Sequence, residues 1–343
     1  MAEPFVTVLV PVRNEERYIE RCLYSLAAQD YPRARFEVLV IDGRSTDATR
    51  EIVARFAAES TVDLRLLDNP RQKTAAGLNA GLAAARGEVI VRVDGHSSVA
   101  GDFLRGGVYA LFDSGADCAG GVIASEGDTY VGRAIAIAMS SRFGVGGVGF
   151  RVGGEGPVET VAFGAYRRDV FDRIGPFTED IDKGEDDEFN YRLRDAGGLI
   201  LLVPEIQARY TVRGDLPGLW RQYFGYGRAK PLVLARHPAQ ARARQFAPLA
   251  LVGALAATSA LALSGKIAPL KALLVVYSSG ATIASLVSAP RHGWRYLPPL
   301  PIAFACLHVS YGLGFAAGLM GLAGRTLVRT ARSGAHQSTE APT

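Results

Sequence analysis

Cysteine is scarce in this sequence, and acidic residues almost disappear from its last third. The 343 residues include 3 cysteines, Cys22, Cys118 and Cys306, which lie far apart and form no CxxC pair. This spacing excludes a disulfide framework and a cysteine zinc site, and it indicates a reducing compartment for the soluble part. A disordered or fibrous protein is excluded as well, because 48% of the residues are hydrophobic and 21% are charged.

Charge divides the chain into two unlike parts. Residues 1–215 contain all but one of the 34 acidic residues and are net acidic, whereas residues 216–343 contain only Glu340 and are net basic. A basic region often binds nucleic acid, but here the basic part is also the apolar part. A lipid bilayer is therefore the better partner, and we expect no nucleic-acid binding.

Three long apolar runs lie in the basic part, at 246–264, 272–289 and 297–324. Each approaches or exceeds the roughly 20 residues that a helix needs to cross a bilayer core, and small residues are frequent in all three. We predict a membrane domain over 246–324 with three transmembrane helices. The alternative is a set of buried helices in a soluble protein.

Basic residues predict the orientation of these helices. The segment 216–245 carries several Lys and Arg residues and is expected to be a basic amphipathic segment on the cytoplasmic face. The sequence opens without a signal-peptide pattern, so the first domain is expected in the cytoplasm. Three spans would place the basic part of 325–343 outside, against the positive-inside rule, unless one run is re-entrant. Residues 338–343 are predicted to be a disordered tail.

Residues 1–215 alternate strand and helix patterns. Strands are expected at 5–12, 36–42, 62–67, 88–94 and 117–122, with amphipathic helices at 15–29, 45–58, 74–86 and 102–114. Apolar strands separated by helices predict an α/β domain with a mostly parallel sheet and helices on both faces. Its ligands should lie beyond the carboxyl ends of the strands. A GxGxxG or Walker loop is absent, which excludes the dinucleotide and P-loop fingerprints.

Four motifs follow in a fixed order: VPVRNE at 10–15, VIDGRSTD at 40–47, VRVDGH at 91–96 and GEDDEFNYR at 184–192. Over about residues 5–230 this set resembles the family 2 glycosyltransferases, which have a GT-A fold. Between 184 and 230 the sequence looks most like bacterial exopolysaccharide glycosyltransferases of the succinoglycan type. Those enzymes also have D-x-H in place of D-x-D and C-terminal membrane helices.

The resemblance implies a nucleotide-sugar site at the strand ends. Asp42 matches the aspartate that contacts uracil, and Pro11, Arg13 and Glu15 would hold uracil and ribose. The alternative for Asp42 is an ordinary Asp-Gly turn residue. By position, Lys73 and Asn79 could also face the nucleotide, although a solvated lysine and a capping asparagine fit the same pattern. The candidate donor-binding residues are Pro11, Arg13, Glu15, Asp42, Lys73, Asn79, Asp94, Arg228 and Lys230.

A divalent cation is the expected cofactor, because the diphosphate of a nucleotide-sugar needs positive charge as it leaves. Asp94 lies at a strand end, where a carboxylate can reach a metal or the ribose. In the family, the last residue of D-x-D usually binds the metal, and here that residue is His96. Imidazole suits Mn²⁺ better than Mg²⁺, so both ions are candidates. The alternative for His96 is a polar loop residue.

The acidic cluster is the candidate catalytic centre. Displacement with inversion needs one base to take the proton of the acceptor. Asp186 matches the base of the family's Glu-Asp motif, and Glu185 would orient nearby groups. The alternative is an acidic first turn that stabilises a helix dipole.

The sequence at 220–230, WRQYFGYGRAK, resembles the Q-x-x-R-W region of processive family members, with two departures. Gly225 replaces the arginine and Tyr226 replaces the tryptophan, which argues against processive polymerisation. Arg228 or Lys230 could approach the diphosphate or a lipid phosphate. The alternative is an interfacial helix with its basic face toward anionic lipid.

These patterns together predict a membrane-anchored inverting glycosyltransferase of the bacterial inner membrane. The donor would be a UDP-hexose, with glucose favoured by the subfamily resemblance. The acceptor would be a polyprenyl-diphosphate-linked oligosaccharide in exopolysaccharide or cell-surface glycan synthesis, and other polysaccharide-assembly proteins are candidate partners. Two alternatives stay open: a polyprenyl-phosphate glycosyltransferase, and an inactive scaffold in a polysaccharide assembly complex.

Overall fold

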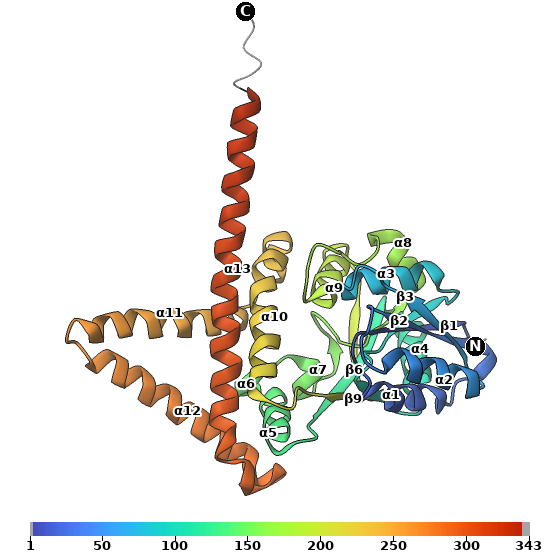
Figure 1. The fold of residues 1–343 in the computed structure, drawn as a ribbon, viewed down its shortest axis with the longest axis horizontal. Coiled ribbons are helices and arrows are strands. Elements are labelled where there is room, and N and C mark those ends of the chain that lie inside the picture. The colour runs from blue at the N-terminus through green and yellow to red at the C-terminus, as the bar shows by residue number, and fades with distance from the viewer. Residues whose placement is uncertain (1–2, 338–343) are drawn as a thin grey trace, which may run out of the picture.

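The structure, a computed structural model, describes residues 3–337, with side chains described as far as residue 324. The predicted disordered end at 338–343 lies outside the described residues. Figure 1 shows an α/β domain, coloured blue to green, beside long helices coloured yellow to red. Helix α10, Leu216–Arg236, stands between the two parts.

A mixed sheet forms the centre of the α/β domain. Within the described residues it has nine strands, in the order β3-β2-β1-β4-β8-β6-β9-β5, with β7 paired to β9. The strands are β1 Val6–Val12, β2 Phe36–Asp42, β3 Asp63–Asp68, β4 Val89–Arg92, β5 Ser97–Val99, β6 Cys118–Glu126, β7 Gly156–Pro157, β8 Ala165–Arg167 and β9 Ile200–Thr211.

The first four strands run parallel, as the alternation of apolar strands and helices predicts. The predicted strand at 117–122 is confirmed as β6, which pairs parallel with β9. The rest of the sheet is mixed, because β8 lies antiparallel between β4 and β6, and β5 and β7 pair antiparallel with β9.

Helices cover both faces of the sheet. One hydrophobic cluster joins the sheet to residues of α1, α2 and α4, and another joins it to residues of α3, α8 and α9. The helices of this domain are α1 Ile19–Ala27, α2 Thr49–Glu59, α3 Thr74–Ala84, α4 Phe103–Ser114, α5 Tyr130–Met139, α6 Arg142–Val145, α7 Gly149–Val152, α8 Arg168–Ile174 and α9 Glu185–Asp195. The sheet is therefore buried on both sides, and polar ligands can reach it only at the strand ends.

Three apolar helices follow α10: α11 Ala243–Leu263, α12 Ala268–His292 and α13 Pro299–Gln337. Within the described residues, these are the helices whose length and composition allow a membrane crossing, α13 through its part Pro299–Gly324. In Figure 1, α11 and α12 diverge from α13, while α10 runs alongside it. The predicted division of the chain at 215, 245 and 324 stays a prediction, although α13 continues as a helix beyond 324.

Glycines bring the backbones of α10 and α13 into direct contact. A Cβ atom at Gly314 would lie 2.2 Å from the carbonyl oxygen of Phe224, and one at Gly318 would lie 2.4 Å from that of Arg228. From the other side, a Cβ atom at Gly227 would lie 2.1 Å from the carbonyl oxygen of Tyr311. Small residues four apart on α13 allow this approach, a common device in membrane helix pairs. The α/β domain is thus joined to α13 through α10.

Gly314→Val should separate α10 from α13 and lower the free energy of unfolding by about 1–3 kcal/mol, the usual cost of overpacking. Thermal unfolding in detergent would measure the loss. Gly321→Val is the matched control, since a Cβ atom there meets nothing within 4 Å. Equal stability of the two variants would show that the contact between α10 and α13 does not matter to the fold.

Candidate active site

A cavity of about 1230 Å³ opens where the carboxyl ends of β1, β2 and β4 face α9 and α10. It extends without interruption from these strand ends to the apolar helices. Its sheet end is lined by Pro11, Arg13, Glu15, Gly43, Asp94 and His96, and its other end by Leu251, Tyr277, His308 and Tyr311. One space therefore joins the polar end of the sheet to helices that could lie in a bilayer.

Arg92 holds three carboxylates together at the middle of this cavity. Its Nη2 atom lies 3.0 Å from Oδ1 of Asp94 and 3.0 Å from Oε1 of Glu185, and its Nη1 atom forms an ion pair with Asp186. The Arg92 side chain is only 9% exposed. Burial alone would lower the pKa of Arg92, but Asp94 and Glu185 outweigh it and raise the pKa. Arg92 thus stays charged and brings the end of β4 to the start of α9.

The first turn of α9 places the acidic cluster. Gly184 precedes the helix with φ +81°, a left-handed conformation that favours glycine. Four acidic residues then fill the first turn, where the positive end of the helix dipole stabilises them. The acidic cluster can therefore stabilise the helix dipole and still serve as the candidate catalytic centre, because Glu185 and Asp186 line the cavity.

His96 and Asp94 have the surroundings expected of two metal ligands. The Nδ1 atom of His96 lies 3.0 Å from a carboxylate oxygen of Glu15, and its buried Nε2 atom has no hydrogen-bond partner among the described residues. A carboxylate that fixes one imidazole nitrogen while the other faces the site is the usual support for a metal-binding histidine. Arg92 donates to Oδ1 of Asp94, and no bond to Oδ2 is found within residues 3–324.

The ligand set is incomplete in the protein alone. Among the residues with described side chains, no three His, Cys, Asp or Glu side chains gather around a common point. Nucleotide-dependent enzymes commonly bind Mg²⁺ through one or two protein ligands plus substrate phosphates, so two ligands suffice if a diphosphate completes the set. Burial would lower the pKa of His96, but Tyr210, Glu15 and Asp94 raise it to about 9. A metal at Nε2 would have to compete with that proton.

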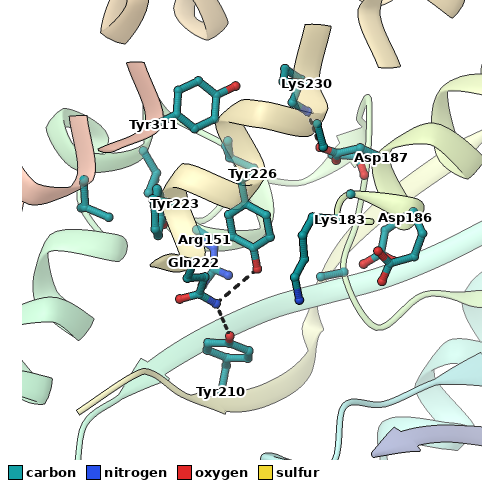
Figure 2. A pocket seen from close by; sticks show the side chains of 18 of the residues that line it. Arg151, Lys183, Asp186, Asp187, Tyr210, Gln222, Tyr223, Tyr226, Lys230 and Tyr311 are labelled. Carbon is teal, nitrogen blue, oxygen red and sulfur yellow. Dashed lines mark hydrogen bonds and ion pairs between the residues drawn. The ribbon is translucent and has the colours of Figure 1, made fainter. Parts of the chain in front are cut away.

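Aromatic and amide side chains form the opposite wall, which Figure 2 shows from close by. The Gln222 amide nitrogen donates to the hydroxyl of Tyr210 at 2.8 Å and to that of Tyr226 at 3.2 Å. Above this network, Lys230 forms an ion pair with Asp187. Burial would lower the pKa of Lys230, but Asp187 raises it. The pair links α9 to α10 next to the candidate base.

Most of the predicted site residues meet at this cavity. Those lining it are Pro11, Arg13, Glu15, Lys73, Asp94, His96, Glu185, Asp186 and Lys230. Their assigned roles stay predictions. Lys73 forms an ion pair with Asp182, so it sits at the rim and already has a partner.

Three candidates do not line the cavity. Asp42 is buried and accepts hydrogen bonds from Ser45 and Arg50, although its neighbours Ile41 and Gly43 reach the cavity wall. The amide nitrogen of Asn79 donates to the carbonyl of Phe177 and to the carboxylate of Glu179, and its amide oxygen accepts from the backbone N–H of Phe177. Arg228 is exposed, on the part of α10 that packs against α13. This geometry gives no support to a donor contact by these three.

Two residues without a predicted role lie at the centre of the site. Arg92 lies within the VRVDGH motif. A charged residue in an otherwise apolar strand is the sequence feature that could have marked it as a site residue. Lys183, which precedes Gly184, gave no signal beyond its place next to the acidic motif. Only the structure shows that its side chain lines the cavity.

A mixed α/β sheet with an acidic site beyond its strand ends is the arrangement of GT-A glycosyltransferases. The solved structure of the mannosyltransferase PcManGT from Pyrobaculum calidifontis, in complex with GDP-Man and Mn²⁺, has this fold. Its TM-score to this chain is 0.63 at 24% sequence identity, and the match covers 90% of this chain and 88% of that one.

The chain belongs to glycosyl transferase family 2, whose model matches residues 7–175. The succinoglycan biosynthesis protein ExoA of Rhizobium meliloti (strain 1021) is 32% identical over 247 residues, which cover 71% of this chain and 74% of the relative. A second relative is the dolichyl N-acetyl-alpha-D-glucosaminyl phosphate 3-beta-D-2,3-diacetamido-2,3-dideoxy-beta-D-glucuronosyltransferase of Methanococcus voltae. It is 26% identical over 240 residues, covering 68% of this chain and 74% of the relative. The protein is thus a glycosyltransferase of the glycan-synthesis type.

Proposed function

We propose that this protein is a membrane-anchored inverting glycosyltransferase that moves a hexose, with glucose favoured, from a UDP-sugar to a polyprenyl-diphosphate-linked oligosaccharide. The observation that carries the proposal is the continuous cavity from the strand ends, past Asp186, to α12 and α13. A nucleotide-sugar suits the polar end and a lipid-linked acceptor suits the apolar end. The names of the two relatives, a succinoglycan biosynthesis protein and a dolichyl-linked sugar transferase, support this choice.

The proposed location is the cytoplasmic face of a bacterial inner membrane. Nucleotide-sugars are present in the cytoplasm, and the basic residues before α11 favour that side for the α/β domain. The apolar helices then serve two purposes, as an anchor and as a wall of the acceptor site.

The proposed chemistry is a direct displacement at the anomeric carbon. The acceptor hydroxyl forms a bond to this carbon as the bond to the diphosphate breaks, and Asp186 takes the hydroxyl proton. Glu185 and Arg92 hold Asp186 in position, because Arg92 contacts both carboxylates. A divalent cation held by Asp94 and His96 would neutralise charge on the leaving diphosphate.

The decisive experiment uses the full-length protein in detergent. A panel of UDP-sugars and GDP-mannose would be offered with polyprenyl-monophosphate and with polyprenyl-diphosphate oligosaccharides, and nucleoside diphosphate release and lipid products would be measured. Transfer from a UDP-hexose to the diphosphate-linked glycan with inverted anomeric configuration supports the proposal. A sugar-monophosphate lipid as product would instead favour the polyprenyl-phosphate transferase, and no turnover with any pair would favour the inactive scaffold.

Metal preference gives a separate test of His96. Mn²⁺ should support transfer at least as well as Mg²⁺, and excess chelator should lower it. His96→Asp should shift the preference severalfold toward Mg²⁺, because an all-oxygen ligand set suits the harder ion. Binding of Mn²⁺ in the presence of UDP, followed by electron paramagnetic resonance, gives a readout independent of turnover. An unchanged metal preference in His96→Asp would remove His96 from the ligand set.

A further inference from the structure

Lys183 occupies the space beside Gly225, the position where this chain departs from the Q-x-x-R-W pattern. A Cβ atom built on Gly225 would lie 3.5 Å from Cγ of Lys183. The stem of the lysine, which comes from the loop before α9, therefore packs on α10 where any longer side chain at 225 would lie. The glycine leaves room for a cation that reaches the cavity from a different element.

The ammonium of Lys183 points into the cavity without an anionic partner. Figure 2 shows its side chain extended between Asp186 and Tyr226, with the nitrogen directed toward the Tyr210 side. No hydrogen bond or ion pair of this ammonium is found within residues 3–324. It lies close enough to Asp94 to lower the pKa of that carboxyl, a smaller effect than that of Arg92. The charge thus faces the region between the candidate metal ligands and the candidate base.

Three of the other cations that line the cavity beside the acidic cluster are already engaged. Arg92 is bound by three carboxylates, and Lys230 by Asp187. Lys73 pairs with Asp182. A diphosphate entering beside Asp186 would therefore find the ammonium of Lys183 available, whereas Arg92, Lys230 and Lys73 would each have to leave a carboxylate.

We infer that Lys183, whose stem lies in the space that Gly225 leaves open, binds the diphosphate of the nucleotide-sugar donor. The inference rests on the proposed function. As the bond between the anomeric carbon and the diphosphate oxygen breaks, the electron pair stays on the nucleoside diphosphate, while the acceptor proton passes to Asp186. Lys183 faces the added negative charge. Such fixed positive charge stabilises the transition state more than the ground state.

Binding without turnover tests this inference. Titration calorimetry would compare the full-length protein and Lys183→Met for UDP and GDP, each against its nucleoside. Lys183→Met should lose about tenfold to a hundredfold in nucleoside diphosphate affinity, the range for one charged hydrogen bond. Nucleoside affinity and thermal stability should not change. Lys266→Met, in the loop between α11 and α12, is the matched control and should bind UDP as the native protein does.

An exchange of positions makes the test sharper. Lys183→Ala combined with Gly225→Arg should recover at least tenfold in UDP affinity over Lys183→Ala alone, because the arginine stem can use the space that the lysine vacates. Failure of this recovery, together with normal UDP binding by Lys183→Met, would overturn the inference while the proposed function stands.

Two further outcomes separate the possible sources of the diphosphate. If Lys183→Met binds UDP normally but raises only the KM for the lipid-linked acceptor, the lysine contacts the acceptor phosphate, and the assignment to the donor is wrong. If the native protein binds neither UDP nor GDP, the proposed donor class fails and the inference fails with it.

Discussion

Asp186→Asn should lower the rate of glycosyl transfer by about 10²–10⁴ and leave donor binding intact. The substitution keeps the shape of the side chain and removes the proton acceptor, and a positioned general base contributes a factor of this size. The nucleotide and metal would still be held by the strand-end residues, since Asp94 and His96 lie outside α9. Single-turnover kinetics, with UDP affinity measured in parallel, would separate the two effects.

Its neighbours on α9 provide the controls. Asp187 faces Lys230, about 100° around the helix from Asp186, so Asp187→Asn should reduce stability more than chemistry. Glu185→Gln should lie between the two in rate, because Glu185 contacts Arg92 but is not the proposed base. Near-normal turnover in Asp186→Asn with a dead Asp187→Asn would mean that the base stands one residue later.

Arg92→Met should cost about 3–5 kcal/mol of stability, the usual effect of removing one partner from a buried ion pair. The loss follows from the three carboxylates that Arg92 holds, which would then repel one another in a poorly solvated site. Denaturant unfolding in detergent measures it. Arg55→Met is the matched control: its pair with Glu20 is exposed on both sides and should contribute less than about 1 kcal/mol.

The loss in Arg92→Met should depend on pH in a known direction. Burial would raise the pKa of Asp94, but Arg92 and His96 hold it below its ordinary value. A carboxyl with a lowered pKa in the folded state stabilises the fold above its unfolded pKa, near 4, and that contribution disappears as the pH falls. The stability difference between the native protein and Arg92→Met should therefore be largest near neutral pH and shrink below about pH 4. A difference independent of pH would mean that Arg92 acts by packing.

The parallel half of the sheet was predictable because its signals are local. Strands β1, β2 and β4 are continuous apolar runs, and such runs between helices have one common arrangement. Strands β5, β7 and β8 have two or three residues each, which is too short for a pattern, and their pairing is decided by distant strands. These three short strands could therefore be seen only in three dimensions.

The candidate site shows the same limit. Resemblance brought Asp94 and Asp186 to one place, since each stands in a motif. The pairing of Asp42 with Arg50 and of Lys230 with Asp187 depends on side-chain directions that motifs do not encode. The relation between Lys183 and Gly225 is of this kind too, because it joins residues 42 positions apart whose contact follows from the way α9 packs beside α10.

The glycine contact between α10 and α13 also bears on the distance between the active site and a membrane. Because α10 carries one wall of the cavity and packs against α13, the proposed base on α9 would stand at a set height above the bilayer if α13 crosses it as proposed. A lipid-linked acceptor of the proposed kind would enter with its phosphate at the membrane surface, so only a sugar hydroxyl at one distance along the glycan would reach Asp186. Glycans one unit shorter or longer would present the wrong sugar at that height. The enzyme would thus select its acceptor partly by the number of sugar units between the lipid phosphate and the reacting hydroxyl.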